Sequence, residues 1–153
     1  SYDGICKGVA SEHRWFPFFE KYTVGTSEQV IRERLREHSI VFSKVTRGTL
    51  SEWVGTASAD ILIGDIRLRA NINFTFYKNV LSSTAIFWNG HAFETVPYFQ
   101  FWSRVISHSI SETDSRGNPT FVSAIEGEPL NIWASCTLKS YREELYQNEG
   151  TGD

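Results

Sequence analysis

A strict alternation of apolar and polar residues over 66–76 constrains the fold more than any other feature of the chain. The apolar positions are Ile66, Leu68, Ala70, Ile72, Phe74 and Phe76, and the residues between them are Arg67, Arg69, Asn71, Asn73 and Thr75. A period of two predicts a β-strand with one buried face and one polar face. At about 3.3 Å per residue the strand would span roughly 36 Å, which is longer than most strands.

Several other segments also favour β-structure. Residues 85–88 and 91–96 flank Asn89-Gly90, a dipeptide that accepts positive φ at both positions and predicts a hairpin turn. Further strands are expected over 40–45, 99–106, 120–125 and 130–138, and a polar, mobile tail from residue 143. Seven or eight strands and one helix in 153 residues predict an all-β sandwich or barrel.

The expected helix covers residues 27–38. Thr26 and Gln29 have the spacing of a capping box at its start. Val30, Ile31 and Leu35 form a narrow apolar stripe, and arginines occupy much of the rest. Such a helix is expected on the surface of the domain.

The first 25 residues are expected to form an extended arm before a domain at 26–153. The arm carries four large rings, Trp15, Phe16, Phe18 and Phe19. Exposed rings in this number would form an apolar patch, so they must pack on their own domain or on a neighbour.

Composition excludes some classes of function. The chain is 41% hydrophobic and 22% charged, as expected for a folded domain, and its formal charge of −3 disfavours nucleic-acid binding driven by net charge. It has no apolar run of membrane length. Local basic groups remain on the expected helix (Arg32, Arg36) and strand (Arg67, Arg69). These arginines would contact RNA phosphates or acidic partners, or be solvated without a function.

The histidines do not form a convincing catalytic site. His91 and Glu94 are three residues apart, so on one strand they would point to opposite faces. His108 near Asp114 would make a hydrolase triad with a serine, but these residue types are common. The sequence therefore predicts no enzyme and no cofactor.

The remaining chemical signals also have ordinary structural explanations. Asp60 and Asp65 would bind a cation or simply end strands, and no metal is expected. Asn73 begins a glycosylation sequon inside the clearest strand, where a structural role is expected. Cys6 and Cys136 are far apart, and free thiols are favoured over one bridge.

Four short segments follow one another in a characteristic order: residues 24–36, residues 63–69, Trp88-Asn89-Gly90 with 96–99, and residues 130–135. In this order they resemble the jelly-roll capsid proteins of picorna-like positive-strand RNA viruses, in particular those of the dicistro-, ifla- and marnavirus type. The first is similar to a segment that often precedes the barrel, and the second to a Gly followed by alternating residues. The third is similar to a turn and a Val-Pro-Tyr strand end, and the fourth to the last barrel strand.

This resemblance implies an eight-stranded antiparallel jelly roll of two four-stranded sheets with one N-terminal surface helix. It implies a structural subunit of an icosahedral shell around an RNA genome, in a virion assembled in the host cytoplasm. The implied partners are other capsid subunits, with genomic RNA on the inner face and a host receptor left open, and no membrane. The expected subunit contacts are the arm rings and the basic residues: Trp15, Phe16, Phe18, Phe19, Arg32, Arg36, Arg67 and Arg69.

Two alternatives come from other classes of function. The first is a small calycin-like or NTF2-like ligand-binding protein or enzyme, with a cone-shaped fold and an aromatic-lined cavity. The second is a β-sandwich module that binds sugar or peptide on an exposed platform formed by Trp53, Trp88 or Trp102.

Overall fold

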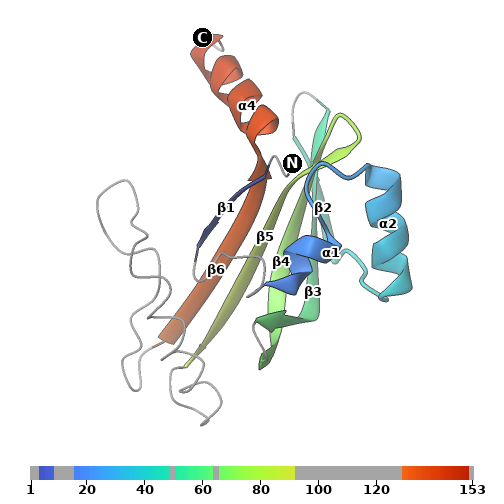
Figure 1. The fold of residues 1–153 in the computed structure, drawn as a ribbon, viewed down its shortest axis with the longest axis vertical. Coiled ribbons are helices and arrows are strands. Elements are labelled where there is room, and N and C mark those ends of the chain that lie inside the picture. Colours follow the sequence, from blue (N-terminus) through green and yellow to red (C-terminus); the bar gives the residue numbers. More distant parts are fainter. Residues whose placement is uncertain (1–3, 9–15, 49–50, 64–65, 92–128, 152–153) are drawn as a thin grey trace.

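The computed structural model describes residues 4–8, 16–48, 51–63, 66–91 and 129–151 (Figure 1). The elements in chain order are β1 (Gly4–Gly8), α1 (Pro17–Lys21), α2 (Glu28–Glu37), β2 (Lys44–Arg47), β3 (Glu52–Ile63), β4 (Ile66–Tyr77), β5 (Val80–His91), β6 (Pro129–Leu138) and α4 (Lys139–Thr151). The described part of the chain is mostly β, in agreement with the expected fold class.

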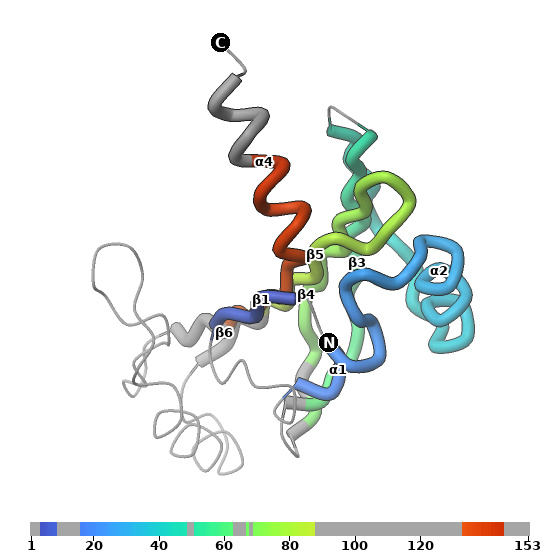
Figure 2. Tube along the Cα trace, turned by 45° about the horizontal axis from the view of Figure 1, so that its top comes forward, coloured from blue at the N-terminus to red at the C-terminus, as the bar shows by residue number. Residues whose placement is uncertain are grey.

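The strands form one antiparallel sheet of six strands in the order β1-β6-β5-β4-β3-β2. β2 to β5 follow one another as neighbours, whereas β1 lies at the far edge beside β6 (Figure 1). Helices α1 and α2 lie near β3 and β4, and α4 extends away from the end of β6 (Figure 2). We call the sheet face that carries α1 and α2 the inner face.

The alternation over 66–76 produces β4, as predicted. Ala70, Ile72, Phe74 and Phe76 are buried on the inner face, whereas the polar residues of the other face are exposed or half-buried, namely Arg67, Arg69, Asn71, Asn73 and Thr75. The same alternation buries one face of β3 and β5, and α1 and α2 complete this core. The helices therefore cover the apolar face that a lone sheet would leave in water.

The hairpin predicted at Asn89-Gly90 is wrong. Both residues lie within β5, where Asn89 pairs with Asn131 and Gly90 with Leu130 of β6. The tight turn lies at Lys78-Asn79 instead, with φ of 51° and 64°. Two successive positive φ values are typical of a two-residue hairpin turn, and asparagine tolerates this conformation. Pairing with the distant strand β6 overrides the local preference of Asn-Gly.

The predicted surface helix is confirmed as α2, with a different cap. Ser27, one residue after Thr26, is the N-cap, and its hydroxyl accepts a hydrogen bond from the Val30 amide at 3.4 Å. Ile31 and Leu35 are buried against the sheet. Val30 is 37% exposed, so the apolar stripe is even narrower than predicted.

The described residues of the expected arm, 4–8 and 16–25, belong to the domain itself. Residues 4–8 form β1 and pair with β6, and α1 is helical rather than extended. Phe16, Phe18 and Phe19 are at most 8% exposed and belong to the core. The prediction of an extended arm is corrected for these residues, because their rings bury against the sheet of the same chain.

The preference for free thiols is also corrected, since Cys6 and Cys136 form a disulfide bond. Cys6 of β1 lies directly opposite Cys136 of β6, with 4.1 Å between the Cα atoms. Directly opposite residues of neighbouring strands project to the same face, which brings the two sulfur atoms together. A separation of 130 residues in sequence gave no sign of this contact.

The C-terminal segment forms helix α4 instead of the expected mobile tail. Tyr141 is 9% exposed, and its hydroxyl donates a hydrogen bond to the Glu52 carboxylate at 2.5 Å. Its ring lies 5.4 Å from that of Tyr77. These contacts fix the first turn of α4 on the hairpin ends.

The other predicted strands had mixed outcomes. β6 matches the strand expected over 130–138, and only residues 44 and 45 of the strand expected over 40–45 are in β2. The strands expected over 99–106 and 120–125 lie outside the described residues.

Candidate functional site: a groove beside β3

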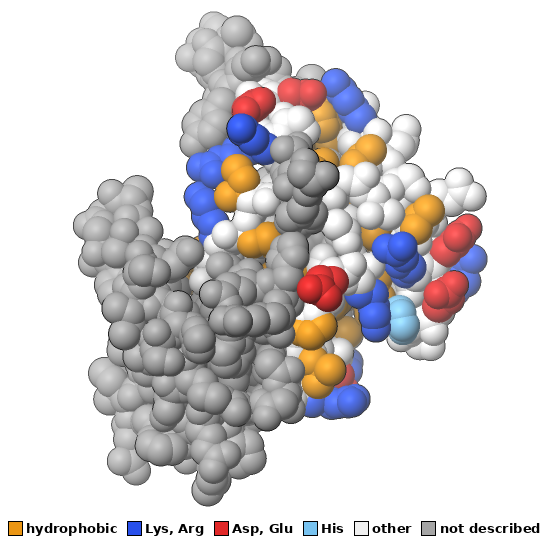
Figure 3. Space-filling view, viewed as in Figure 1, with side chains coloured by type: hydrophobic (Ala, Val, Ile, Leu, Met, Phe, Trp, Pro, Cys, Tyr) orange, Lys and Arg blue, Asp and Glu red, His pale blue; other side chains and the backbone are white. Residues whose placement is uncertain are grey.

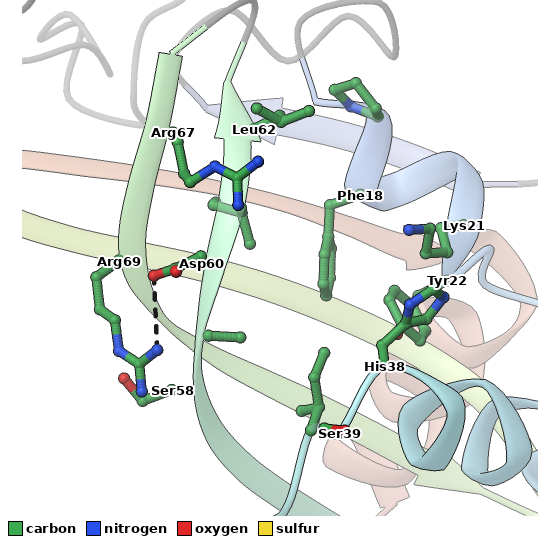
Figure 4. A pocket seen from close by; sticks show the side chains of 14 residues that line it. Phe18, Lys21, Tyr22, His38, Ser39, Ser58, Asp60, Leu62, Arg67 and Arg69 are labelled. Carbon is green, nitrogen blue, oxygen red and sulfur yellow. Dashed lines mark ion pairs between the residues drawn. The ribbon is translucent and has the colours of Figure 1, made fainter.

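A groove of about 470 Å³ lies between α1 and the outer part of β3. Helix α1 contributes Phe18, Lys21 and Tyr22, and the segment after α2 contributes residues 38–40. Residues 58–62 of β3 form the opposite wall, to which Arg67 and Arg69 of β4 add (Figure 4). This volume falls within the roughly 300–1,000 Å³ typical of ligand sites.

The groove exists because β2 accompanies β3 over only part of its length. The β2 register begins with Lys44 opposite Thr56 and runs to Arg47 opposite Trp53. Ser43 still donates to the Thr56 carbonyl, but before Ser43 the chain lies off the edge of β3. There Phe42 packs against Trp53 and Phe74, with ring centroids 5.7 and 5.8 Å away. The chain therefore turns onto the inner face, and this segment does not pair with the rest of β3.

Gly55 permits this turn. A Cβ atom at Gly55 would lie 2.6 Å from Cζ of Phe42, far inside van der Waals contact. Any other residue would push the Phe42 ring off the sheet. The glycine and the ring together determine where β2 and β3 separate.

Beyond this point, residues 57–63 of β3 have an open edge. β4 pairs with them on one side, and within the described residues no strand pairs with them on the other. An open edge presents unpaired backbone N–H and C=O groups. The groove runs along this edge, with α1 as its far wall (Figure 4).

The electrostatic character of the groove is basic. Its lining includes Lys21, Arg67 and Arg69 but one carboxylate, that of Asp60. Asp60 Oδ1 lies 3.5 Å from Nη1 of Arg69, so these two charges compensate each other (Figure 4). Lys21 on one wall and Arg67 on the other have no ion-pair partner among the described residues. The space-filling view shows basic side chains beside exposed apolar surface on this side of the molecule (Figure 3).

Tyr22 adds an unusual polar group to the lining. The residue is 1% exposed, and its hydroxyl has no hydrogen-bond partner among the described residues. Its ring lies 4.7 Å from Phe18 and 5.6 Å from Phe74. Burial raises the pKa of Tyr22 to about 12, opposed by the nearby charge of Arg34. A buried hydroxyl without a hydrogen-bond partner costs about 1–3 kcal/mol of stability.

The structure separates the basic residues that the sequence singled out. Arg67 and Arg69 line the groove, whereas Arg32 and Arg36 lie on α2 beside a different, polar depression. Arg32 Nε lies 3.4 Å from the Glu28 carboxylate, and its guanidinium is 4.8 Å from the Trp53 ring centroid. The role of Arg32 in this structure is therefore to fix α2 on the sheet.

The aromatic candidates have a structural role where they are described. Phe16, Phe18 and Phe19 belong to the core, although Phe18 also lines the groove, and Trp15 lies outside the described residues. Trp53 is 7% exposed and stacks on Phe76 at 4.4 Å, so it forms no exposed platform.

The other residues considered from the sequence give no site. Asn73 accepts a hydrogen bond from the Thr56 hydroxyl at 2.9 Å within the sheet. Over the described ranges, no three His, Cys, Asp or Glu side chains converge to hold a metal ion. The remaining candidates lie outside the described residues or have side chains that are not described: Asp65, Trp88, His91, Glu94, Trp102, His108 and Asp114.

Sequence reasoning missed three groove residues, Lys21, Tyr22 and His38. Lys21 and Tyr22 were grouped with the arm, and His38 was the last residue of the expected helix. They approach β3 only because α1 and the end of α2 fold over its inner face. No local pattern carries that information.

Comparisons with known protein families, with curated protein sequences and with solved structures found no match. Of the helices the structure describes, none has the length and apolar character needed to cross a membrane. The fold and the groove thus define the class: a predominantly β domain with helices on one sheet face and an open, basic groove at the sheet edge.

Proposed function

We propose that the protein is a binding protein whose groove between α1 and β3 takes an anionic ligand with an apolar part. The observation that carries this proposal is the composition of the groove. Exposed apolar surface lines one cavity of about 470 Å³ together with Lys21 and Arg67, which have no ion-pair partner among the described residues. The sequence analysis offered a small ligand-binding protein as an alternative to the capsid subunit. The present proposal is of that class, but its cavity lies at the edge of the sheet.

The walls provide two kinds of attraction. Leu62, which is 43% exposed, and the half-buried Ile40 offer apolar area, whose burial contributes about 25 cal/mol per Å². Lys21 and Arg67 attract an anionic group from opposite sides. Because Lys21 and Arg67 are exposed, their attraction will weaken as salt increases.

Titration with 1-anilinonaphthalene-8-sulfonate, a small anionic aromatic dye, tests the proposal. We expect saturable binding at one site, followed by dye fluorescence. Lys21→Glu should weaken binding about fivefold or more, since it reverses a charge at the groove, which corresponds to about 1 kcal/mol.

Lys44→Glu is the matched control, because Lys44 is exposed on β2 and does not line the groove. It should change the affinity less than twofold. Equal effects of the two variants, or no saturable binding, would contradict the proposal.

The jelly-roll capsid subunit remains a second proposal. In its favour stand the order of the short motifs along the chain and a sheet that is antiparallel throughout. The described sheet has six strands and not the four expected for each jelly-roll sheet, and a second layer would have to come from residues 92–128, outside the described ranges. Electron microscopy of the purified protein tests this reading: shells or pentamer-like oligomers would support it, and monomers or dimers would contradict it.

A further inference from the structure

We propose that the natural ligand of the groove is an acidic peptide segment of a partner protein, which adds as an extended strand to the open edge of β3. This inference rests on the proposed binding function and names the class of ligand. Edge addition uses backbone hydrogen bonds for affinity and alternate side chains for specificity.

The edge is long enough for this mode of binding. Residues 57–63 span about 23 Å at 3.3 Å per residue, the length of an ordinary strand. β4 holds this part of β3 in register along its whole length, from Ala57 opposite Ile72 to Ile63 opposite Ile66. A peptide would therefore meet a strand that is already ordered.

The path of the segment between α2 and β2 leaves this edge without a partner strand in the described part of the chain. Ser39 has a φ of 56°, and the Ile40 amide donates to the Leu35 carbonyl at 2.8 Å, so the chain ends α2 in a tight turn. Phe42 then carries the chain over Gly55 on the inner face. Phe18 stands between α1 and β3 and bounds the remaining space (Figure 4).

The two sides of the edge differ in chemistry, and this predicts the peptide's pattern. Ala59 and Ile61 are buried on the inner face, where Phe18 and Ile40 also line the groove. Ser58, Asp60 and Leu62 are exposed on the outer face, next to the arginines of β4. Side chains of an added strand point alternately to the two faces. The complementary peptide alternates apolar and acidic residues.

The positive charges beside the edge favour a peptide with acidic rather than basic side chains. Asp60 is paired with Arg69, so among the described residues Arg67 is the positive charge on the outer side that has no acidic partner. Lys21 adds a positive charge on the wall formed by α1. The glutamates of an alternating peptide lie on the outer side, where they meet Arg67, while Lys21 adds to the positive potential of the groove from its inner wall.

The test uses a fluorescein-labelled peptide of alternating valine and glutamate, with binding followed by fluorescence anisotropy. Two further peptides keep the same side chains but carry N-methyl groups on either the odd-numbered or the even-numbered residues. Only one of these sets of amides faces β3 in an added strand. We expect one methylated peptide to bind at least about tenfold more weakly and the other within about threefold of the parent.

Equal loss or equal retention in the two methylated peptides would overturn strand addition. A valine–lysine peptide is the charge control and should bind at least about tenfold more weakly than the valine–glutamate peptide. If the dye binds in a Lys21-dependent manner but the acidic peptide does not bind, the peptide inference fails while the binding function stands. If neither binds, both fail.

Discussion

The ring of Phe42 lies directly over Gly55, where a Cβ atom would come within 2.6 Å of the ring. This contact takes the chain away from the edge of β3 after a short pairing with β2. The groove and the open strand edge are both consequences of that departure. A contact between one ring and one glycine therefore creates the candidate site.

Gly55→Ala should destabilise the protein by about 1–3 kcal/mol, because the new methyl group overlaps the Phe42 ring. Urea unfolding measures the loss. In a Phe42→Leu background the same substitution should cost less, since the smaller side chain leaves room. An equal cost in both backgrounds would show that the ring is not the cause.

Tyr22→Phe should raise the free energy of unfolding by up to about 1 kcal/mol. The hydroxyl is buried without a partner among the described residues, so its removal relieves a desolvation penalty. The same variant should bind the groove ligand more weakly if the hydroxyl bonds to that ligand. Thermal unfolding and dye titration on the same samples separate the two effects, and a clear loss of stability would contradict this reading of Tyr22.

Alkaline pH should destabilise the fold through Tyr22. Its pKa is raised from the ordinary tyrosine value of 10.0 to about 12 in the folded protein, mainly because burial disfavours the phenolate. Between these values the unfolded chain binds fewer protons than the folded one, so the free energy of unfolding falls as pH rises. The contribution of Tyr22 to the free energy of unfolding is fully present below about pH 10 and is lost as the pH rises toward about 12.

Tyr22 alone should lower the free energy of unfolding by at most about 1.4 kcal/mol for each pH unit in this range. Burial and the hydrogen bond to Glu52 also raise the pKa of Tyr141, which acts in the same direction. Urea unfolding at several pH values should show a shallower decline for Tyr22→Phe than for the parent. Parallel curves would contradict the assignment.

Reduction of the disulfide between Cys6 and Cys136 should lower stability by about 2–5 kcal/mol. The bridge joins β1 to β6 across 130 residues and restricts the unfolded chain. Thermal unfolding with and without a reductant measures the effect. Cys6→Ser should start at the lower stability and show no further change with reductant, whereas a reductant effect in that variant would need another cause.

The elements that the sequence could predict are those whose apolar residues recur with the period of a strand or a helix. The alternation over 66–76 gave β4, the one over 130–138 gave β6, and the stripe around Ile31 and Leu35 gave α2. β3 was missed because Gly55 and a run of alanine and serine lack β-propensity, and pairing with β4 makes the strand.

The groove was predictable only in part. Arg67 and Arg69 stood out as basic residues on a strand, and both line it. Lys21, Tyr22 and His38 could not be assigned, because only tertiary packing brings them beside β3. The disulfide was hidden for the same reason, since the pairing of β1 with β6 joins the two ends of the chain.

The central claim is that ligands bind between α1 and β3, and an NMR titration of the ¹⁵N-labelled protein with the anionic dye tests it most directly. We predict that the amide shift changes concentrate in the groove walls, at residues 17–22, 38–40 and 58–62. Shift changes centred instead on the polar face of α2, or on the surface between β6 and α4, would contradict the account.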